Sequence, residues 1–478
     1  MAKRKRVSSS SAPKIEYRYR KPKHNFRERR GSTRLPPALS TVHLDAAGID
    51  IGAASHYVAV PADRDEQPVR EFGAFTDDLY QLADWLAECG IKTVAMESTG
   101  SYWIPLLEIL EARGFEVHLV NTHRLKFVPG RKSDVLDCQW LQTLHTFGLL
   151  AGCFRPDDEI CALRSYLRQH ATLVRCSAEH IQRMQKALTQ MNLKLPQVLS
   201  DITGATGIRI IEAILGGARD PVALAQLRDP RCKNSTETIA KELLGNWREE
   251  HLFALKQEYD LYPKYQASIT ECGQKIEAEM ARFQDKSQGR ELARNCRRPN
   301  LPEFNIRQAL YRMTGVDLTD IDGIDAYTAM VVVSELGTDL KKHFPTEDQF
   351  ASWLALCPGT HKTGGHQKSS RTRRSSNRVA AALRMAASSL HHSQTALGAY
   401  YRRMQVRLGK PEAVTAVAHK LARLVYKVMT LGMQYLDPGQ DHYQQQYRQR
   451  QVRNLKRRAK QLGFELTPMT ESALQQAS

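Results

Sequence analysis

The sequence predicts an α/β domain followed by two mostly helical regions. Short apolar runs alternate with segments of helical spacing between residues 41 and 150. Apolar residues then recur at intervals of three and four through much of 155–290, and amphipathic helical segments dominate 301–437. A chain of 478 residues with 42% hydrophobic residues is long enough for two or three domains with substantial cores.

The first region opens with strands and continues with alternating helices and strands. We expect strands in residues 48–61, 69–75, 93–96 and 117–120, with the second pairing to the first, and helices in 79–86, 103–110 and 134–150. Leu79, Leu82, Trp85 and Leu86 share one face of the first helix, and Gly114 ends the second. This order fits an RNase-H-like nuclease core, although periodicity alone does not separate it from other α/β folds.

Four carboxylates stand out in this region. Asp50 and Glu97 follow apolar runs on two predicted strands, and Asp134 and Asp137 stand three residues apart on a predicted helix. Hard divalent cations prefer oxygen ligands, and two metal ions about 3.5–4 Å apart need several carboxylates from different elements. Each acid alone could be a turn residue, a cap or part of a solvated face. Together they predict a Mg²⁺ or Mn²⁺ site for phosphodiester chemistry.

The middle region carries two heptad-like seams. The first extends from Leu163 to Met191 over four repeats, and the second covers residues 252–283. Pro263 lies inside the second seam, where we expect a kink or a break. An antiparallel helical hairpin within one chain and a coiled coil between chains both satisfy this spacing.

The C-terminal region contains two glycine-bearing motifs. Residues 321–329 resemble a helix-hairpin-helix, whose turn either binds phosphate or only joins two helices; Asp325 replaces its second glycine. Residues 357–374 form a loop rich in glycines, hydroxyls and positive charge. In this loop Lys368, Arg371, Arg373 and Arg374 are candidate nucleic-acid contacts.

The charge balance indicates a polyanionic partner. The net charge is +18, and residues 1–34 hold thirteen Lys and Arg against two acids, so we expect a disordered basic arm. No apolar stretch of signal-peptide or membrane-span length is present. Nine cysteines without paired spacing read as free thiols of a cytosolic protein.

Seven short segments, taken in order, resemble the DEDD-type transposases of bacterial insertion sequences. The resemblance is to the insertion-sequence one-ten family and its one-one-one-one subgroup. The matching segments cover roughly half of the chain: Gly48–Gly52, Met96–Gly100, Lys132–Asp137, Ile321–Ile324 with Ala329, Leu356–Gly359, Gly364-Gly365 and Asn377–Ala387. Any one of them is weak, but seven in this order are specific.

The resemblance implies a bridge-RNA-guided DNA recombinase with a RuvC-like domain, a coiled-coil dimerisation arm and a C-terminal domain bearing a serine nucleophile. The metal-bound acids would be Asp50, Glu97, Asp134 and Asp137. The family places its serine just before the Gly-Gly pair, where this chain has Thr363. A threonine hydroxyl can attack phosphorus, so Thr363 is the first choice of nucleophile and Ser369 the second.

We therefore predict a transposase that cuts and rejoins DNA through a covalent protein–DNA intermediate. The alternatives are a hydrolytic RuvC-like structure-specific nuclease and a non-catalytic nucleic-acid-binding scaffold. Expected partners are DNA, a guide RNA and further copies in a dimer or tetramer, with no membrane. The expected location is the bacterial cytoplasm, near the nucleoid. The predicted regions are a basic arm (1–40), a RuvC-like domain (41–150), a dimerisation region (151–300), a transposase domain (301–437) and a basic tail (438–478) expected to fray.

Overall fold

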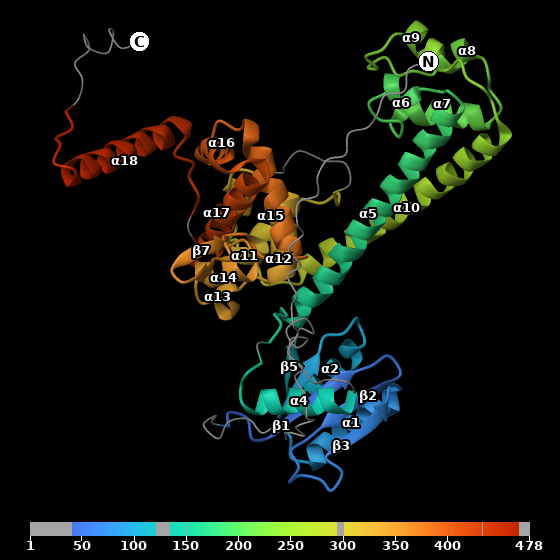
Figure 1. Cartoon of the computed structure of the whole chain (residues 1–478). Helices are drawn as coiled ribbons and strands as arrows, with labels where there is room; N and C mark the ends of the chain where they lie inside the picture. Colours follow the sequence, from blue (N-terminus) through green and yellow to red (C-terminus); the bar gives the residue numbers. More distant parts are fainter. Residues whose placement is uncertain (1–40, 121–133, 151, 294–300, 433, 468–478) are drawn as a thin grey trace, which may run out of the picture. The chain divides into compact units, whose positions relative to one another are not determined.

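The chain divides into two compact units, residues 1–154 and 155–478, in the computed structural model (Figure 1). The structure describes residues 41–120, 134–150, 152–293, 301–432 and 434–467, without the side chains of residues 134, 135, 361 and 362. The predicted basic arm lies outside these ranges, and the finer division into five regions stays a prediction. Within these ranges, no helix combines the length and the apolar character needed to cross a membrane.

The first unit is built on a five-stranded mixed sheet. Its strands are β1 (Ala46–Ile51), β2 (Ser55–Ala59), β3 (Val69–Gly73), β4 (Thr93–Glu97) and β5 (Glu116–Val120), in the order β3-β2-β1-β4-β5. The β1–β2 and β2–β3 pairs are antiparallel, whereas the β1–β4 and β4–β5 pairs are parallel. This arrangement fits an RNase-H-like domain, as the sequence predicted.

One predicted strand is two strands in the structure. Residues 48–61 do not run straight, because the Gly52 amide donates to the Ser55 carbonyl at 3.1 Å and turns the chain. A Cβ on Gly52 would lie 2.4 Å from the same oxygen, so glycine is needed here. Because the apolar run continues on both sides of the turn, the apolar pattern of the sequence does not reveal the turn.

The two faces of the sheet are covered by different helices. Helices α1 (Thr76–Glu88) and α2 (Trp103–Ala112) pack against alternate strand residues such as Ile49 and Met96. The predicted apolar face of α1 is buried, and Gly114 with φ of +84° follows the end of α2, as predicted. Helix α4 (Asp134–Thr146) lies on the other face, where its Leu141 packs with Ala95 and Val120.

The second unit contains a long antiparallel helical hairpin made of α5 (Asp158–Gln190) and α10 (Glu249–Ala281) (Figure 1). Cys272 Sγ donates to the Tyr166 carbonyl at 3.3 Å, and further along Gln266 Nε2 donates to Ser177 Oγ at 3.0 Å. Most of the first seam is buried in this packing. The hairpin alternative is therefore the one that the structure contains, while dimerisation through this region stays a prediction. The prediction of a break at Pro263 was wrong, because α10 continues through this residue while packed against α5.

Short helices close the end of this hairpin around a core of their own: α6 (Leu195–Val198), α7 (Ala205–Leu215), α8 (Pro221–Gln226) and α9 (Thr236–Glu242). The rest of the unit is mostly helical. Its elements are α11 (Ile306–Thr314), η1 (Leu318–Asp320), α12 (Ala326–Leu336), α13 (Leu340–His343), α14 (Glu347–Trp353), β6 (His361–Thr363), β7 (His366–Ser369), α15 (Arg378–Ser389), η2 (Leu390–His392), α16 (Ala396–Leu408), α17 (Lys410–Leu431) and α18 (Gln440–Gln461). The prediction that the tail frays was wrong for residues 440–461, since these 22 residues form helix α18.

Candidate active site

Two of the predicted acids end neighbouring parallel strands. Ile49 of β1 and Met96 of β4 are register partners, so Asp50 and Glu97, the next residues, stand at the same level of the sheet. Side chains alternate between faces along a strand, so Asp50 shares a face with Gly48, and Glu97 shares it with Ala95. Both carboxylates are half-buried. The register therefore brings them to one edge and one face.

Helix α4 crosses the same face in backbone contact with β1. A Cβ on Gly48 would lie 2.3 Å from the amide nitrogen of Gln142 and 2.4 Å from the carbonyl oxygen of Cys138. Only glycine leaves room for a helix at this distance. Gly48 was predicted only as part of a motif and not as a close-packing position, although a lone glycine in a strand is a recognised signal of close backbone approach.

This crossing brings α4 to Asp50. Asp137 directly precedes Cys138, whose carbonyl lies over Gly48, two residues before Asp50. The pKa of the Cys138 thiol is raised to about 12, first by burial and further by the negative charges of Asp50 and Asp137. Both carboxylates therefore act on one buried thiol. Asp134 begins the same helix one turn earlier, and its side chain is outside the described set.

The donor chemistry of these acids fits a hard divalent cation. Asp50, Glu97 and Asp137 offer carboxylate oxygens only, and Thr99 Oγ1 donates to Glu97 Oε2 at 3.3 Å, which orients that carboxylate. Among the described side chains, a set that omits Asp134, no three His, Cys, Asp or Glu residues are grouped tightly enough to hold a metal ion. The fit therefore rests on oxygen chemistry and strand register.

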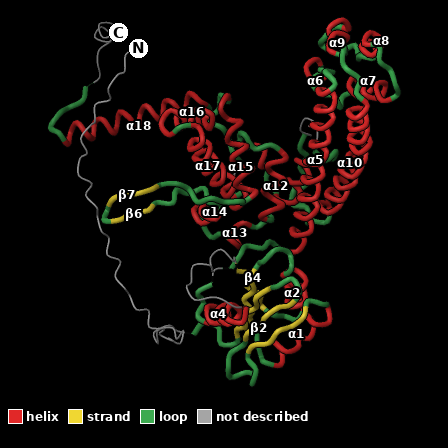
Figure 2. The backbone as a smooth tube through the Cα atoms, turned by 45° about the vertical axis from the view of Figure 1, so that its right-hand side comes forward, coloured by secondary structure: helices red, strands yellow, loops and turns green. Residues whose placement is uncertain are grey.

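The second candidate element is the hairpin of β6 and β7, drawn in yellow in Figure 2 (Figure 2). Gly364 and Gly365 form its two-residue turn with φ of +56° and +79°. Two positive φ angles are the signature of a type I′ turn, which non-glycine residues adopt at a cost. The Gly-Gly pair, predicted to let backbone approach phosphate, is thus accounted for by the turn itself.

The two candidate nucleophiles occupy opposite ends of this hairpin. Thr363 is exposed beside the turn and is the register partner of His366. Ser369 is half-buried at the base, where its Oγ accepts a hydrogen bond from the Arg371 amide at 3.3 Å. The Thr363 hydroxyl is therefore the better presented of the two.

The four predicted cations of this loop do not behave alike. Arg373 donates to the Ser352 carbonyl at 2.7 Å and so ties the loop to the end of α14. All four side chains are exposed: Lys368, Arg371, Arg373 and Arg374. Their role as nucleic-acid contacts stays a prediction, with Arg373 already carrying a structural contact.

The segment that resembles a helix-hairpin-helix has a structural explanation. Gly323 has φ of +85°, and a Cβ there would lie 3.0 Å from the Ala386 carbonyl. Asp325 caps α12 by accepting from the Thr328 amide at 2.8 Å. A carboxylate already at the helix N-terminus opposes phosphate there, so these contacts favour the turn as a joint between helices.

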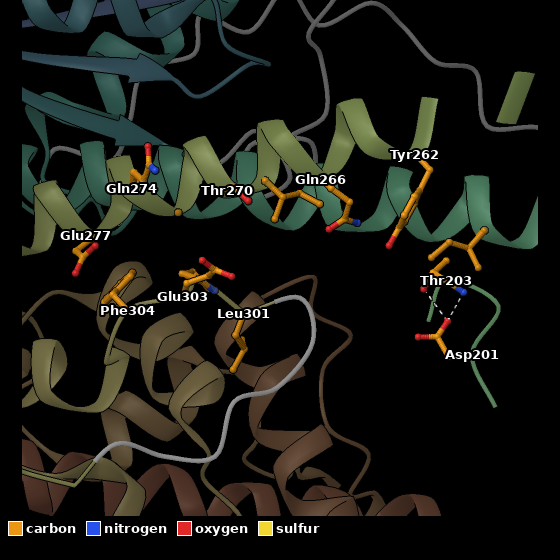
Figure 3. A pocket seen from close by; sticks show the side chains of 14 residues that line it. Asp201, Thr203, Tyr262, Gln266, Thr270, Gln274, Glu277, Leu301, Glu303 and Phe304 are labelled. Atoms are coloured by element: carbon orange, nitrogen blue, oxygen red, sulfur yellow. Dashed lines mark hydrogen bonds between the residues drawn. The ribbon is translucent and has the colours of Figure 1, made fainter. Parts of the chain in front are cut away.

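A pocket of about 790 Å³ lies beside the α5–α10 hairpin, and Figure 3 shows the side chains that line it. Asp201, Glu277 and Glu303 contribute acids to its lining. Asp201 Oδ1 accepts from the amide and hydroxyl of Thr203 at 2.8 and 2.6 Å. None of the predicted site residues lines it.

Two family models match the chain in sequence order. Residues 47–193 match the model named for DEDD transposases of IS110 and described as a transposase. Residues 317–402 match the model described as Transposase IS116/IS110/IS902 family. No curated protein matches the chain significantly. The first match spans all four predicted acids, and the second spans the β6–β7 hairpin.

Proposed function

Because the chain belongs to the IS110 family of DEDD transposases, enzymes that cut and rejoin DNA during transposition, we propose that it works through a covalent protein–DNA intermediate and an RNA guide. The observation that supports this most directly is the shared face of β1, β4 and α4. Asp50 and Glu97 end neighbouring parallel strands on this face, and Asp137 belongs to the helix that crosses it.

The carboxylates are proposed to bind the divalent metal ion that DEDD transposases generally require, here Mg²⁺ or Mn²⁺. Such an ion neutralises phosphate charge and aligns the reacting oxygens when it is bound. Asp50 and Glu97 would contribute oxygens from the sheet, and Asp134 and Asp137 would contribute them from α4, since residues three apart on a helix lie together.

The Thr363 hydroxyl is the proposed nucleophile. Its Oγ1 forms a bond to phosphorus, the bond from phosphorus to one deoxyribose oxygen breaks, and that oxygen leaves with a proton. Rejoining reverses these steps, with a deoxyribose hydroxyl releasing the threonine. The phosphoester bond energy is kept, so no further energy source is needed.

We propose that His366 receives the threonine proton. Opposite residues on an antiparallel pair have Cβ atoms about 4.5–5.5 Å apart on the same face, within reach of an imidazole. Thr363 and His366 form such a pair next to the turn. The hydrolytic nuclease alternative needs neither residue, which makes the two mechanisms separable.

A denaturing gel tests the covalent step. Labelled DNA carrying an element end should shift to a protease-sensitive adduct with the wild-type chain. Thr363→Ala should abolish the adduct, Thr363→Ser should keep or increase it, and Ser369→Ala should leave it unchanged. If the Thr363→Ala variant still forms the adduct and the Ser369→Ala variant does not, Ser369 is the nucleophile. Free DNA ends without any adduct from the wild-type chain would favour the hydrolytic nuclease.

Single Asp50→Asn, Glu97→Gln or Asp137→Asn changes test the acids. Each should abolish strand cleavage and leave the melting temperature and RNA binding nearly unchanged, because each exchange keeps the side-chain shape. Asp63→Asn, on an exposed loop of the same unit, is the matched control. Full cleavage by the triple variant would contradict the metal-site proposal.

The role of a guide RNA is tested by asking whether DNA cleavage depends on that RNA. Cleavage of an element end should require RNA transcribed from the non-coding DNA beside the gene. Exchanging the pairing segment of that RNA should redirect the cut. Cleavage at the same position without RNA would remove this part of the proposal and leave the covalent step untouched.

A further inference from the structure

Helix α18 has a composition that its own contacts do not account for. No side chain of its 22 residues is buried. Between residues 448 and 460 it carries seven exposed cations and no acid: Arg448, Arg450, Arg453, Lys456, Arg457, Arg458 and Lys460. None of the seven forms an ion pair with the described residues. A helix with so little buried surface gains little stability from packing, which is the main source of helix stability in proteins.

The charges within this helix repel one another. Arg453 and Arg457 are four residues apart, as are Lys456 and Lys460, and like charges at this spacing destabilise an isolated helix by about 0.2–0.5 kcal/mol per pair. An anionic partner would relieve this repulsion. The like charges of the basic half therefore lower the stability of α18, and an anionic partner would offset this cost.

The other half of α18 is anchored to the body of the unit by aromatic–cation contacts. The Arg403 guanidinium of α16 lies 4.2 Å from the ring centre of Tyr447 and 5.3 Å from that of Tyr443. Lys420 of α17 lies 4.8 Å from the Tyr400 ring. The pKa of Lys420 is lowered, first by burial and then by the charges of Arg403 and Arg450. The charge of Arg450 on α18 thus acts on Lys420 of α17.

The basic half presents a linear stripe. Arg450, Arg453, Arg457 and Lys460 are spaced by three, four and three residues, which places them on one side of the helix within about 80°. The stripe is about 15 Å long at 1.5 Å per residue. That length spans about four base-pair steps along the duplex axis, at about 3.4 Å each.

We propose that α18 binds duplex DNA, with its basic stripe along a phosphate backbone and the helix in the major groove. A helix about 10–12 Å across fits the roughly 12 Å major groove of B-form DNA. The deep, narrow major groove of A-form RNA excludes it. Gln449, beside the stripe, supplies an amide that can reach base edges. This surface is separate from the proposed hydroxyl chemistry and does not depend on it.

The test compares two full-length variants that lose equal charge. The first carries Arg450→Gln, Arg453→Gln and Arg457→Gln. The control carries Lys186→Gln, Lys264→Gln and Lys275→Gln, three exposed residues of the α5–α10 hairpin. Fluorescence anisotropy measures binding to a 30-base-pair DNA duplex, to the matching RNA duplex and to single-stranded DNA between 50 and 300 mM salt.

The α18 variant should lower the salt slope for duplex DNA by about 2.7, at about 0.9 for each lost phosphate contact, and the control should not. Binding to the RNA duplex should change little. An equal loss on RNA and DNA duplexes, or a loss on RNA alone, would overturn the assignment. Unchanged DNA binding with a lower oligomer mass in light scattering would also overturn it and make α18 a contact between copies.

Discussion

Replacing Gly48 by alanine tests whether α4 holds its acids against β1. The new Cβ would lie 2.4 Å from the Cys138 carbonyl, whereas ordinary contact begins at 3.4 Å, so α4 must shift by about 1 Å. Overpacking of this kind costs about 1–3 kcal/mol of folding free energy. A displacement of about 1 Å in a catalytic group can cost about 100-fold in rate. We therefore expect a folded variant with about 100-fold slower DNA cleavage.

Two further measurements locate the effect. The Cys138 side chain is 0% exposed, and its thiol pKa of about 12 leaves it protonated at pH 8, so alkylation should be negligible in the wild-type chain. A shift of α4 should increase alkylation at Cys138, read by peptide mass spectrometry. The matched control is Gly152→Ala in the same unit, because its added Cβ meets nothing closer than 3.9 Å.

A Gly48→Ala variant that cleaves DNA at the wild-type rate and melts at the wild-type temperature would contradict this prediction. In that case α4 would not contact β1 at this glycine, and the convergence of Asp137 with Asp50 would lose its structural basis. An equal defect in the Gly152→Ala control would show that any added methyl group in this unit disturbs cleavage.

Three further predictions concern charge, assembly and pH. Deleting residues 1–34, with their thirteen cations, should weaken nucleic-acid binding and lower its salt slope; an unchanged slope would make the arm a bystander. Replacing both Val174 and Ile181 by lysine should give monomers in light scattering. An unchanged oligomer mass would show that the first seam only closes the hairpin within one chain. The pKa of His145 is lowered to about 4, first by burial and then by His118 and His43, so the unfolded chain binds an extra proton between pH 6.5 and 4. Stability should therefore fall as pH falls through that window, by roughly 3 kcal/mol at most, and His145→Gln should flatten the melting-temperature profile there.

The sequence predicted those elements whose signals are local. The buried face of α1, the strands β4 and β5 and the glycine after α2 each depend on a few adjacent residues. The errors have one physical cause, since tertiary contacts override local preference. Packing against α5 carries α10 through Pro263, and Arg403 beneath Tyr447 anchors a helix where the composition predicted fraying.

The candidate site divides in the same way. The positions of Asp50 and Glu97 at strand ends could be predicted because each ends an apolar run, and the parallel register aligns them. Their role as metal ligands stays a prediction. The close packing at Gly48 could not be predicted from the sequence, because it depends on α4 crossing β1 at this residue.

The choice of nucleophile shows where sequence reasoning stops and geometry adds a constraint. Position relative to Gly-Gly favours Thr363, but a loop with many hydroxyls gives no chemical reason for one over another. The hairpin supplies that reason, because a two-residue turn makes Thr363 and His366 register partners, whereas Ser369 is paired with His361 at the base and engaged by the Arg371 amide. A β-branched nucleophile is tolerable beside such a turn, since strands favour β-branched residues and the exposed tip leaves its hydroxyl open to DNA. Threonine at this position is therefore compatible with catalysis, and Thr363→Ser should lose no adduct.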